Sequence, residues 1–155
     1  MDDRFRLQRF VDAQQSVYET VLGELRAGRK RGHWMWFIFP QIAGLGHSMM
    51  AHQFALSSLD EAAAYLAHPV LGSRLRECSV LVVGIEGHSI AEIFGSPDDM
   101  KFRSSMTLFA QAAPEEPIFA ACLQKYFGGE PDPQTLLAEP VAVSHRRCGV
   151  VTRGP

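Results

Sequence analysis

The chain has 155 residues, of which 46% are hydrophobic and 21% are charged, and its formal net charge at pH 7 is −2. This length fits one domain, and the composition is typical of a globular protein rather than a disordered or low-complexity one. The slightly acidic balance provides no overall field to attract nucleic acid, so nucleic-acid binding is not expected.

The N-terminal part of the chain carries a strong helical signal. Apolar residues recur at spacings of three and four through residues 4–27, which predicts an amphipathic helix, with Gly28 as its end. An aromatic block at residues 33–41 follows, on a short helix that Pro40 ends. A glycine loop then leads to a further helix over about residues 48–55.

Three helix starts are marked by serines. Ser58 and Glu61 have the spacing of a capping box, in which the serine oxygen accepts from a first-turn amide and the glutamate reaches back to the serine amide. The same spacing recurs at Ser89. Ser96, before a proline and two acidic residues, predicts a third helix start, with the helix running to about Ala113.

The remaining segments also favour helices. Residues 69–85 keep the three–four spacing, and although an apolar run within them could be a strand, their length favours a helix. Another helix is predicted over residues 117–127, and Asp132 begins a short last one. We therefore expect an all-α fold: a single compact domain of about seven to eight helices over residues 1–138, with a loose tail at 139–155.

The sequence also bears on the cellular compartment of the protein and on whether it holds a metal. Three widely spaced cysteines do not predict a disulfide framework, so reduced thiols are expected. No signal peptide is visible, and no apolar run reaches the length of a membrane span. His47 and His52 lie on different helix faces, and the cysteines have no partners at ligand spacing. We therefore expect a cytoplasmic protein, without a membrane association, a metal site or a cofactor.

The aromatic block has two interpretations. Residues 33–41 include both tryptophans, and their burial in the core would stabilise the fold by about 1.5–3 kcal/mol for each large ring. Alternatively, Trp34 or Trp36 forms a wall on which a ligand stacks, and the polar side chains of His33 and Gln41 orient that ligand. The sequence leaves both interpretations open.

A polar stripe is predicted on the helix that contains Lys101. At helical spacing, Lys101, Ser104 and Ser105 share one face, with Arg103 nearby. A cation with two hydroxyls on one stripe can hold a phosphate or carboxylate group. The alternative is a solvated face whose serines bond back to the helix backbone.

Two weaker candidates are a loop and a basic cluster. The backbone amides of the glycine loop at 44–46 could cradle an anion, but no nucleotide-binding motif is complete, so a plain turn is the alternative. Arg26, Arg29, Lys30 and Arg31 could contact phosphate or an acidic partner. They also suit the C-terminal end of a helix dipole without any ligand.

Four segments of the chain resemble a known family; they are residues 28–41 with 44–46, 67–75, 93–95 and 101–109. The family is the bacterial domain of unknown function eighteen-ten, sometimes labelled calpastatin, and the likeness covers roughly residues 4–137. The resemblance implies an all-helical fold and no established activity. The calpastatin label finds no physical support, because a folded core is unlike a disordered protease inhibitor.

A second, much weaker similarity is to the helical NADAR domains, which are linked to hydrolysis of ADP-ribose N-glycosides. It rests on the Ala-rich helix before residues 71–75, followed by Lys101, Met106 and residues 125–127. The glutamate–histidine signature of those domains is absent before the first motif. The resemblance therefore does not supply a catalytic acid.

The sequence supports two hypotheses of function. In the first, the domain binds a small anionic, nucleotide-like or ADP-ribose-like ligand, and it could be an enzyme that hydrolyses an N-glycosidic bond. His33 is then the only one of the predicted ligand-binding residues that is of a type that titrates near neutral pH. The predicted ligand-binding residues are His33, Trp34, Trp36, Gln41, Lys101, Arg103, Ser104 and Ser105. In the second hypothesis, the protein is a non-catalytic protein-interaction module with a basic rim.

Overall fold

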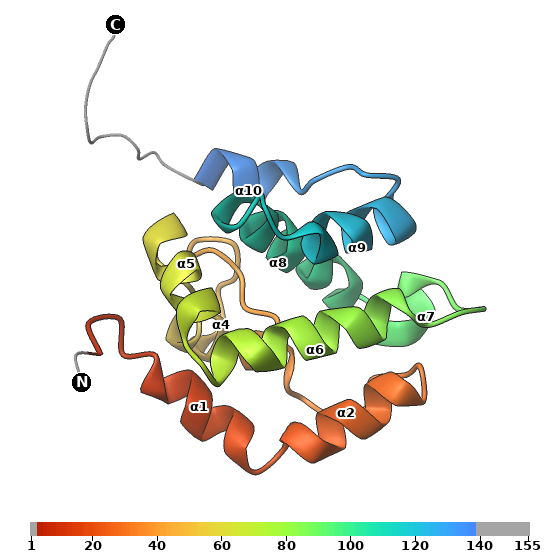
Figure 1. The fold of residues 1–155 in the computed structure, drawn as a ribbon, viewed down its shortest axis with the longest axis horizontal. Coiled ribbons are helices and arrows are strands. Elements are labelled where there is room, and N and C mark those ends of the chain that lie inside the picture. The colour runs from red at the N-terminus through yellow and green to blue at the C-terminus, as the bar shows by residue number, and fades with distance from the viewer. Residues whose placement is uncertain (1–2, 139–155) are drawn as a thin grey trace, which may run out of the picture.

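Ten helices form the described part of the chain, residues 3–138, in the computed structural model (Figure 1). Among these residues the only β-type pairing is an isolated parallel bridge between Ile42 and Leu56, so the predicted all-α class is confirmed. The helices are α1 (Gln8–Gln15), α2 (Tyr18–Arg26), α3 (Met35–Ile38), α4 (Met49–Gln53), α5 (Leu59–Ala67), α6 (Leu71–Val83), α7 (Ile90–Phe94), α8 (Asp98–Ala112), α9 (Pro117–Phe127) and α10 (Pro133–Ala138). The predicted tail at 139–155 lies outside the described residues.

The N-terminal segment forms two helices where the apolar spacing predicts one. α1 ends at Gln15 and α2 begins at Tyr18, with residues 16–17 between them. α1 packs against α3 and α2 packs against α6, so the apolar period continues while the chain changes direction between two partners. This division gives one helix more than the spacing predicts for the segment, and the described residues form ten helices where about seven to eight were expected.

Two of the three predicted serine caps are present. The Ser58 and Ser89 side chains accept hydrogen bonds, both 3.1 Å long, from the amides of Glu61 and Glu92, at the starts of α5 and α7. Only the second is a complete capping box, because the Glu92 carboxylate accepts from the Ser89 amide at 2.7 Å. Glu61 instead accepts from the amide and hydroxyl of Ser57, one residue before the cap.

The start of α8 differs from the prediction. Pro97 rather than Ser96 is the N-cap residue, and no side chain caps this helix. The amides of Met100 and Lys101 donate to the Pro97 carbonyl at 3.0 and 3.2 Å, which satisfies first-turn donors without a serine. The helix therefore begins at Asp98, and its end at Ala112 agrees with the predicted length.

The helices lie in layers around one core. In Figure 1, α6 crosses the middle of the molecule, with α1 and α2 on one side and α8, α9 and α10 on the other. Phe10 of α1, Leu75 of α6 and Phe109 of α8 are fully or almost fully buried between these layers. No helix within residues 3–138 has the length and apolar character needed to cross a membrane.

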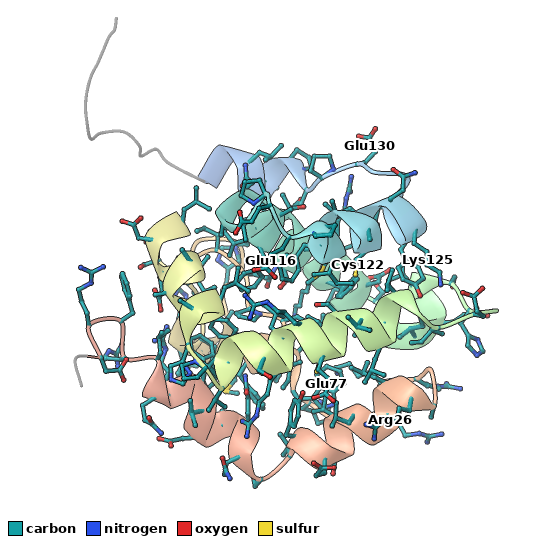
Figure 2. All side chains as sticks on the ribbon, in the orientation of Figure 1. Arg26, Glu77, Glu116, Cys122, Lys125 and Glu130 are labelled. Atoms are coloured by element: carbon teal, nitrogen blue, oxygen red, sulfur yellow. The ribbon has the colours of Figure 1, made fainter. Side chains whose placement is uncertain are left out.

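α9 is fixed to α6 at both of its ends. Figure 2 labels Glu116 and Lys125, which lie at the two ends of α9. Glu116 holds Arg76 of α6 through two contacts, 2.6 and 2.7 Å long. The Lys125 ammonium donates to the carbonyl oxygens of Val83 and Ile85 at 2.7 and 2.6 Å, at the end of α6. Lys125, which contributed to the weaker sequence similarity, therefore has a structural role here.

Candidate ligand-binding cleft

A cleft of about 460 Å³ lies where the loop before α4 meets the beginnings of α8 and α10. Figure 1 shows α10 alongside α8, and the two helices are in contact. The cleft brings together the glycine loop and the polar stripe, which are far apart in the sequence. Its lining residues are Gln41, Gly44, Leu45, Gly46, His47, Pro97, Met100, Lys101, Ser104, Asp132 and Gln134.

The loop side of the cleft is held by backbone pairing. The amide of Ala43 donates to the Leu56 carbonyl at 2.8 Å, and the amide of Leu56 donates to the Gln41 carbonyl at 2.9 Å. These bonds form the parallel bridge between Ile42 and Leu56. Because both Ile42 and Leu56 are buried, the bridge anchors one end of the loop to the core and fixes where Gln41 lies.

Two glycines are required by the shape of the loop. Gly44 has a φ of 98°, which residues with a side chain rarely adopt. A Cβ atom on Gly46 would lie 2.6 Å from the Cβ of Ala51 in α4, closer than two such atoms approach in proteins. Ser48 caps α4 by accepting from the Ala51 amide at 3.0 Å. The glycines therefore allow the loop to reach α4 without a clash.

Lys101 supplies the positive charge of the cleft. Its ammonium lies 5.3 Å from the centre of the Trp36 ring and 3.5 Å from Oδ1 of Asp98. The side chain is 28% exposed, and among residues 3–138 it makes no hydrogen bond. Oδ2 of Asp98 pairs at 2.9 Å with Lys30, whose side chain is only 8% exposed. One carboxylate thus serves two ammonium groups, and the closer contact is the one away from the cleft.

The two tryptophans of the aromatic block have different surroundings. Trp34 is buried, and its Nε1 donates at 2.9 Å to Oε1 of Glu24. Burial acts to raise the pKa of the Glu24 carboxyl, but hydrogen bonds from Arg31, Gly32 and Trp34 outweigh it and hold that pKa below its ordinary value. Trp36 is only partly buried and lines a smaller cavity of about 80 Å³. That cavity shares lining residues with the cleft, so Trp36 is the tryptophan beside the candidate site.

The other predicted ligand-binding residues do not all line the cleft. Ser105 is fully buried, and its hydroxyl has no partner within the described residues. Arg103 donates to the Glu130 carbonyl at 3.0 Å and stacks over a phenylalanine of α9. His33 is exposed and does not line the cleft. Of the eight residues, only Gln41, Lys101 and Ser104 line it.

Asp132 is a cleft residue for which the sequence predicts only a helix start. Its Oδ2 accepts from the Ser104 hydroxyl at 2.7 Å and from the amide and hydroxyl of Thr135. Within residues 3–138, its Oδ1 receives only a 3.4 Å contact from the amide of Gln134. The sequence around Asp132 predicts a helix cap, but nothing in it indicates a contact with Ser104, 28 residues away.

Comparison with known proteins agrees with this architecture. The chain matches the model of a family described as a protein of unknown function (DUF1810) over residues 4–138. It is similar to the crystal structure of the conserved hypothetical protein Rv1873 from Mycobacterium tuberculosis, with 56% identity, a TM-score of 0.89, and coverage of 90% of this chain and 100% of that chain. No curated protein matched. The resemblance seen in the sequence is thereby confirmed, and the chain belongs to the DUF1810 family.

Proposed function

We propose that the protein binds a small anionic ligand in the cleft, and that this ligand is nucleotide-like or ADP-ribose-like. The observation that supports the proposal is the Lys101 ammonium, which lines the cleft and makes no hydrogen bond to any residue between 3 and 138. A lysine ammonium carries three donors, and the 3.5 Å ion pair with Asp98 leaves donors of the partly buried Lys101 without a close acceptor, which is unfavourable. An anion in the cleft supplies acceptors, and each charge-assisted bond contributes about 1.5–3 kcal/mol.

The surroundings of Lys101 are consistent with anion binding. The Trp36 ring beneath the ammonium restricts where the flexible lysine points, and such a contact is worth about 0.5–1 kcal/mol near a surface. Across the cleft, the backbone amides of Gly44, Gly46 and His47 make no hydrogen bond within the described residues. These amides are further donors for a phosphate group.

A binding experiment tests the proposal. Isothermal titration with phosphate, AMP and ADP-ribose should give saturable binding to the parent protein. Lys101→Met should weaken that binding at least tenfold, because it removes the charge and keeps most of the side-chain volume. Arg29→Met is the matched control, since Arg29 is exposed and does not line the cleft. Absence of binding to the parent, or equal losses in both variants, would overturn the proposal.

Cleavage of the bound ligand at an N-glycosidic bond is a separate step. Chromatography of a nucleotide after incubation with the protein should show whether the base is released. A protein that binds without releasing the base would be a binding protein rather than a hydrolase.

The second candidate function is a protein-interaction module with a basic rim. Arg26, Arg29 and Arg31 are exposed, whereas Lys30 pairs with Asp98. Figure 2 labels Arg26 near the end of α2. A depression of about 550 Å³ lies beside this rim, between residues 27–30 and α7. Binding of a polyglutamate peptide that is lost in Arg26→Ser with Arg29→Ser, but kept in Lys101→Met, would support this candidate over the cleft.

A further inference from the structure

The two carboxylate oxygens of Asp132 differ in their hydrogen bonding. Three donors from Ser104 and Thr135 converge on Oδ2. The amide of Asp132 itself donates to the Thr107 hydroxyl at 2.9 Å, which fixes the backbone. Oδ1 has only the long contact with the Gln134 amide among the described residues. A carboxylate oxygen readily accepts two hydrogen bonds, so Oδ1 can accept a donor from a bound molecule.

Lys101 and Asp132 line the same cleft without pairing with each other. Within residues 3–138, Lys101 forms an ion pair with Asp98 and none with Asp132. Opposite charges that share a cleft of about 460 Å³ and stay apart leave room for a molecule between them. Such a molecule needs an anionic group for Lys101 and a hydrogen-bond donor for Asp132.

The other polar groups of the cleft indicate which kind of hydrogen-bond donor the ligand carries. The side-chain amides of Gln41 and Gln134 also line it, and an amide group can both donate and accept. A hydroxyl likewise donates and accepts, so several hydroxyls on one ligand can satisfy the carboxylate and the amides together. An ammonium group could satisfy only the acceptors. The mixed lining therefore favours a polyhydroxyl ligand.

We infer that the cleft recognises a sugar phosphate, with the phosphate held by Lys101 and a sugar hydroxyl donating to Oδ1 of Asp132. This inference rests on the proposed function, because it places the anion of that proposal at the same lysine. It adds that the protein recognises the sugar as well as the phosphate. Asp132 is then a specificity residue for the hydroxyl-bearing part of the ligand.

The first test uses the parent protein alone. Ribose 5-phosphate should bind at least tenfold more tightly than ethyl phosphate, which carries the anion without the hydroxyls, and ribose should bind weakly. Phosphoethanolamine, which replaces the hydroxyls with an ammonium group, should bind no better than ethyl phosphate. If all the phosphates bind alike, or if phosphoethanolamine binds best, the sugar inference is overturned while anion binding stands. If none binds, the proposed function fails as well.

The second test asks whether Asp132 causes the tighter binding of ribose 5-phosphate relative to ethyl phosphate. Asp132→Ser keeps a residue that can cap α10 but removes the whole carboxylate, both Oδ1 and the Oδ2 that accepts from Ser104 and Thr135. This variant should lose the tenfold advantage of ribose 5-phosphate and bind ethyl phosphate as well as or better than the parent, because a negative charge has left the cleft. Lys101→Met should weaken both ligands together. If ribose 5-phosphate keeps its advantage in Asp132→Ser, while a thermal melt shows the variant folded, Asp132 does not read the sugar.

Discussion

The Lys30 ammonium lies 5.1 Å from the centre of the Trp34 ring, much as the Lys101 ammonium lies 5.3 Å from the centre of the Trp36 ring. The Lys30–Trp34 pair and the Lys101–Trp36 pair share the carboxylate of Asp98, yet their surroundings differ. Lys30 is 8% exposed, contacts Asp98 at 2.9 Å and donates to the carbonyl oxygen of Gly32. Lys101 is 28% exposed and lies 3.5 Å from the same carboxylate. The first pair is satisfied by the fold itself, whereas the second retains unused donors beside a cleft. Residue type alone therefore does not distinguish a structural pair from a binding pair.

The largest expected difference between the pairs concerns the tryptophans. Trp34→Ala should lower the free energy of unfolding by about 3–5 kcal/mol, because it empties a buried site and leaves the Glu24 carboxylate without one donor. Trp36→Ala should lower it by about 2 kcal/mol or less, since that ring is only partly buried. Urea denaturation measures both values. Equal losses would mean that the two pairs are both structural.

Removing the shared carboxylate gives the next largest effect. Asp98→Asn should lower the free energy of unfolding by about 1–3 kcal/mol, because the nearly buried Lys30 ammonium loses its charged partner. Lys101→Met breaks only the longer contact and should change stability by about 0.5 kcal/mol or less.

In the Asp98→Asn variant, the affinity for phosphate should rise although the free energy of unfolding falls. Asp98→Asn removes a competing negative charge beside Lys101 and should tighten phosphate binding a few-fold. Titration calorimetry on the Asp98→Asn and Lys101→Met variants checks this. If Asp98→Asn weakens phosphate binding although the protein remains folded, Asp98 positions Lys101 rather than competing with its ligand.

The stability of the Lys30–Trp34 pair at acid pH depends on Glu24, whose carboxylate accepts a hydrogen bond from Trp34. Hydrogen bonds hold the pKa of this carboxyl below its ordinary value of 4.5. A carboxyl with a lowered folded-state pKa adds stability above pH 4.5, and this contribution is lost as the pH falls through the folded-state pKa. Glu24→Gln should therefore flatten the decline in stability below pH 4.5. The exposed Glu115→Gln is the control, and urea midpoints between pH 3 and 7 measure both. An unchanged decline in Glu24→Gln would show that Glu24 does not contribute.

Most of the fold was predictable because its signals are local. α9 extends over the same residues as predicted, from a proline at its first position to Gly128, whose φ of 62° ends it. The break between α1 and α2 has no local signal. It accompanies the burial of Gln14, which donates to the carbonyl of Phe37 and the hydroxyl of Tyr65, 23 and 51 residues away. Such contacts depend on the finished fold and cannot be inferred from spacing.

The candidate site was predictable only in pieces. Gln41, Lys101 and the glycine loop each stood out by residue type, but their convergence depends on the bridge at Ile42 and on the packing of α8 against α10. Helical spacing placed Ser104 and Ser105 on one stripe with Lys101. Spacing fixes the angle around a helix but not which neighbours cover it, and α8 has neighbours on several sides.

Small effects on stability are also expected at the two adjacent serines of α8, and they should have opposite signs. Ser104 donates to Oδ2 of Asp132 at 2.7 Å, so Ser104→Ala should lower the free energy of unfolding by about 1 kcal/mol. The Ser105 hydroxyl is fully buried without a partner among the described residues, and alanine is the better helix former. Ser105→Ala should therefore raise stability, by a few tenths to about 1 kcal/mol. Thermal melts at one pH resolve the signs. If both variants are stabilised, the Ser104–Asp132 bond adds nothing to stability; if both are destabilised, Ser105 has a partner that the geometry does not reveal.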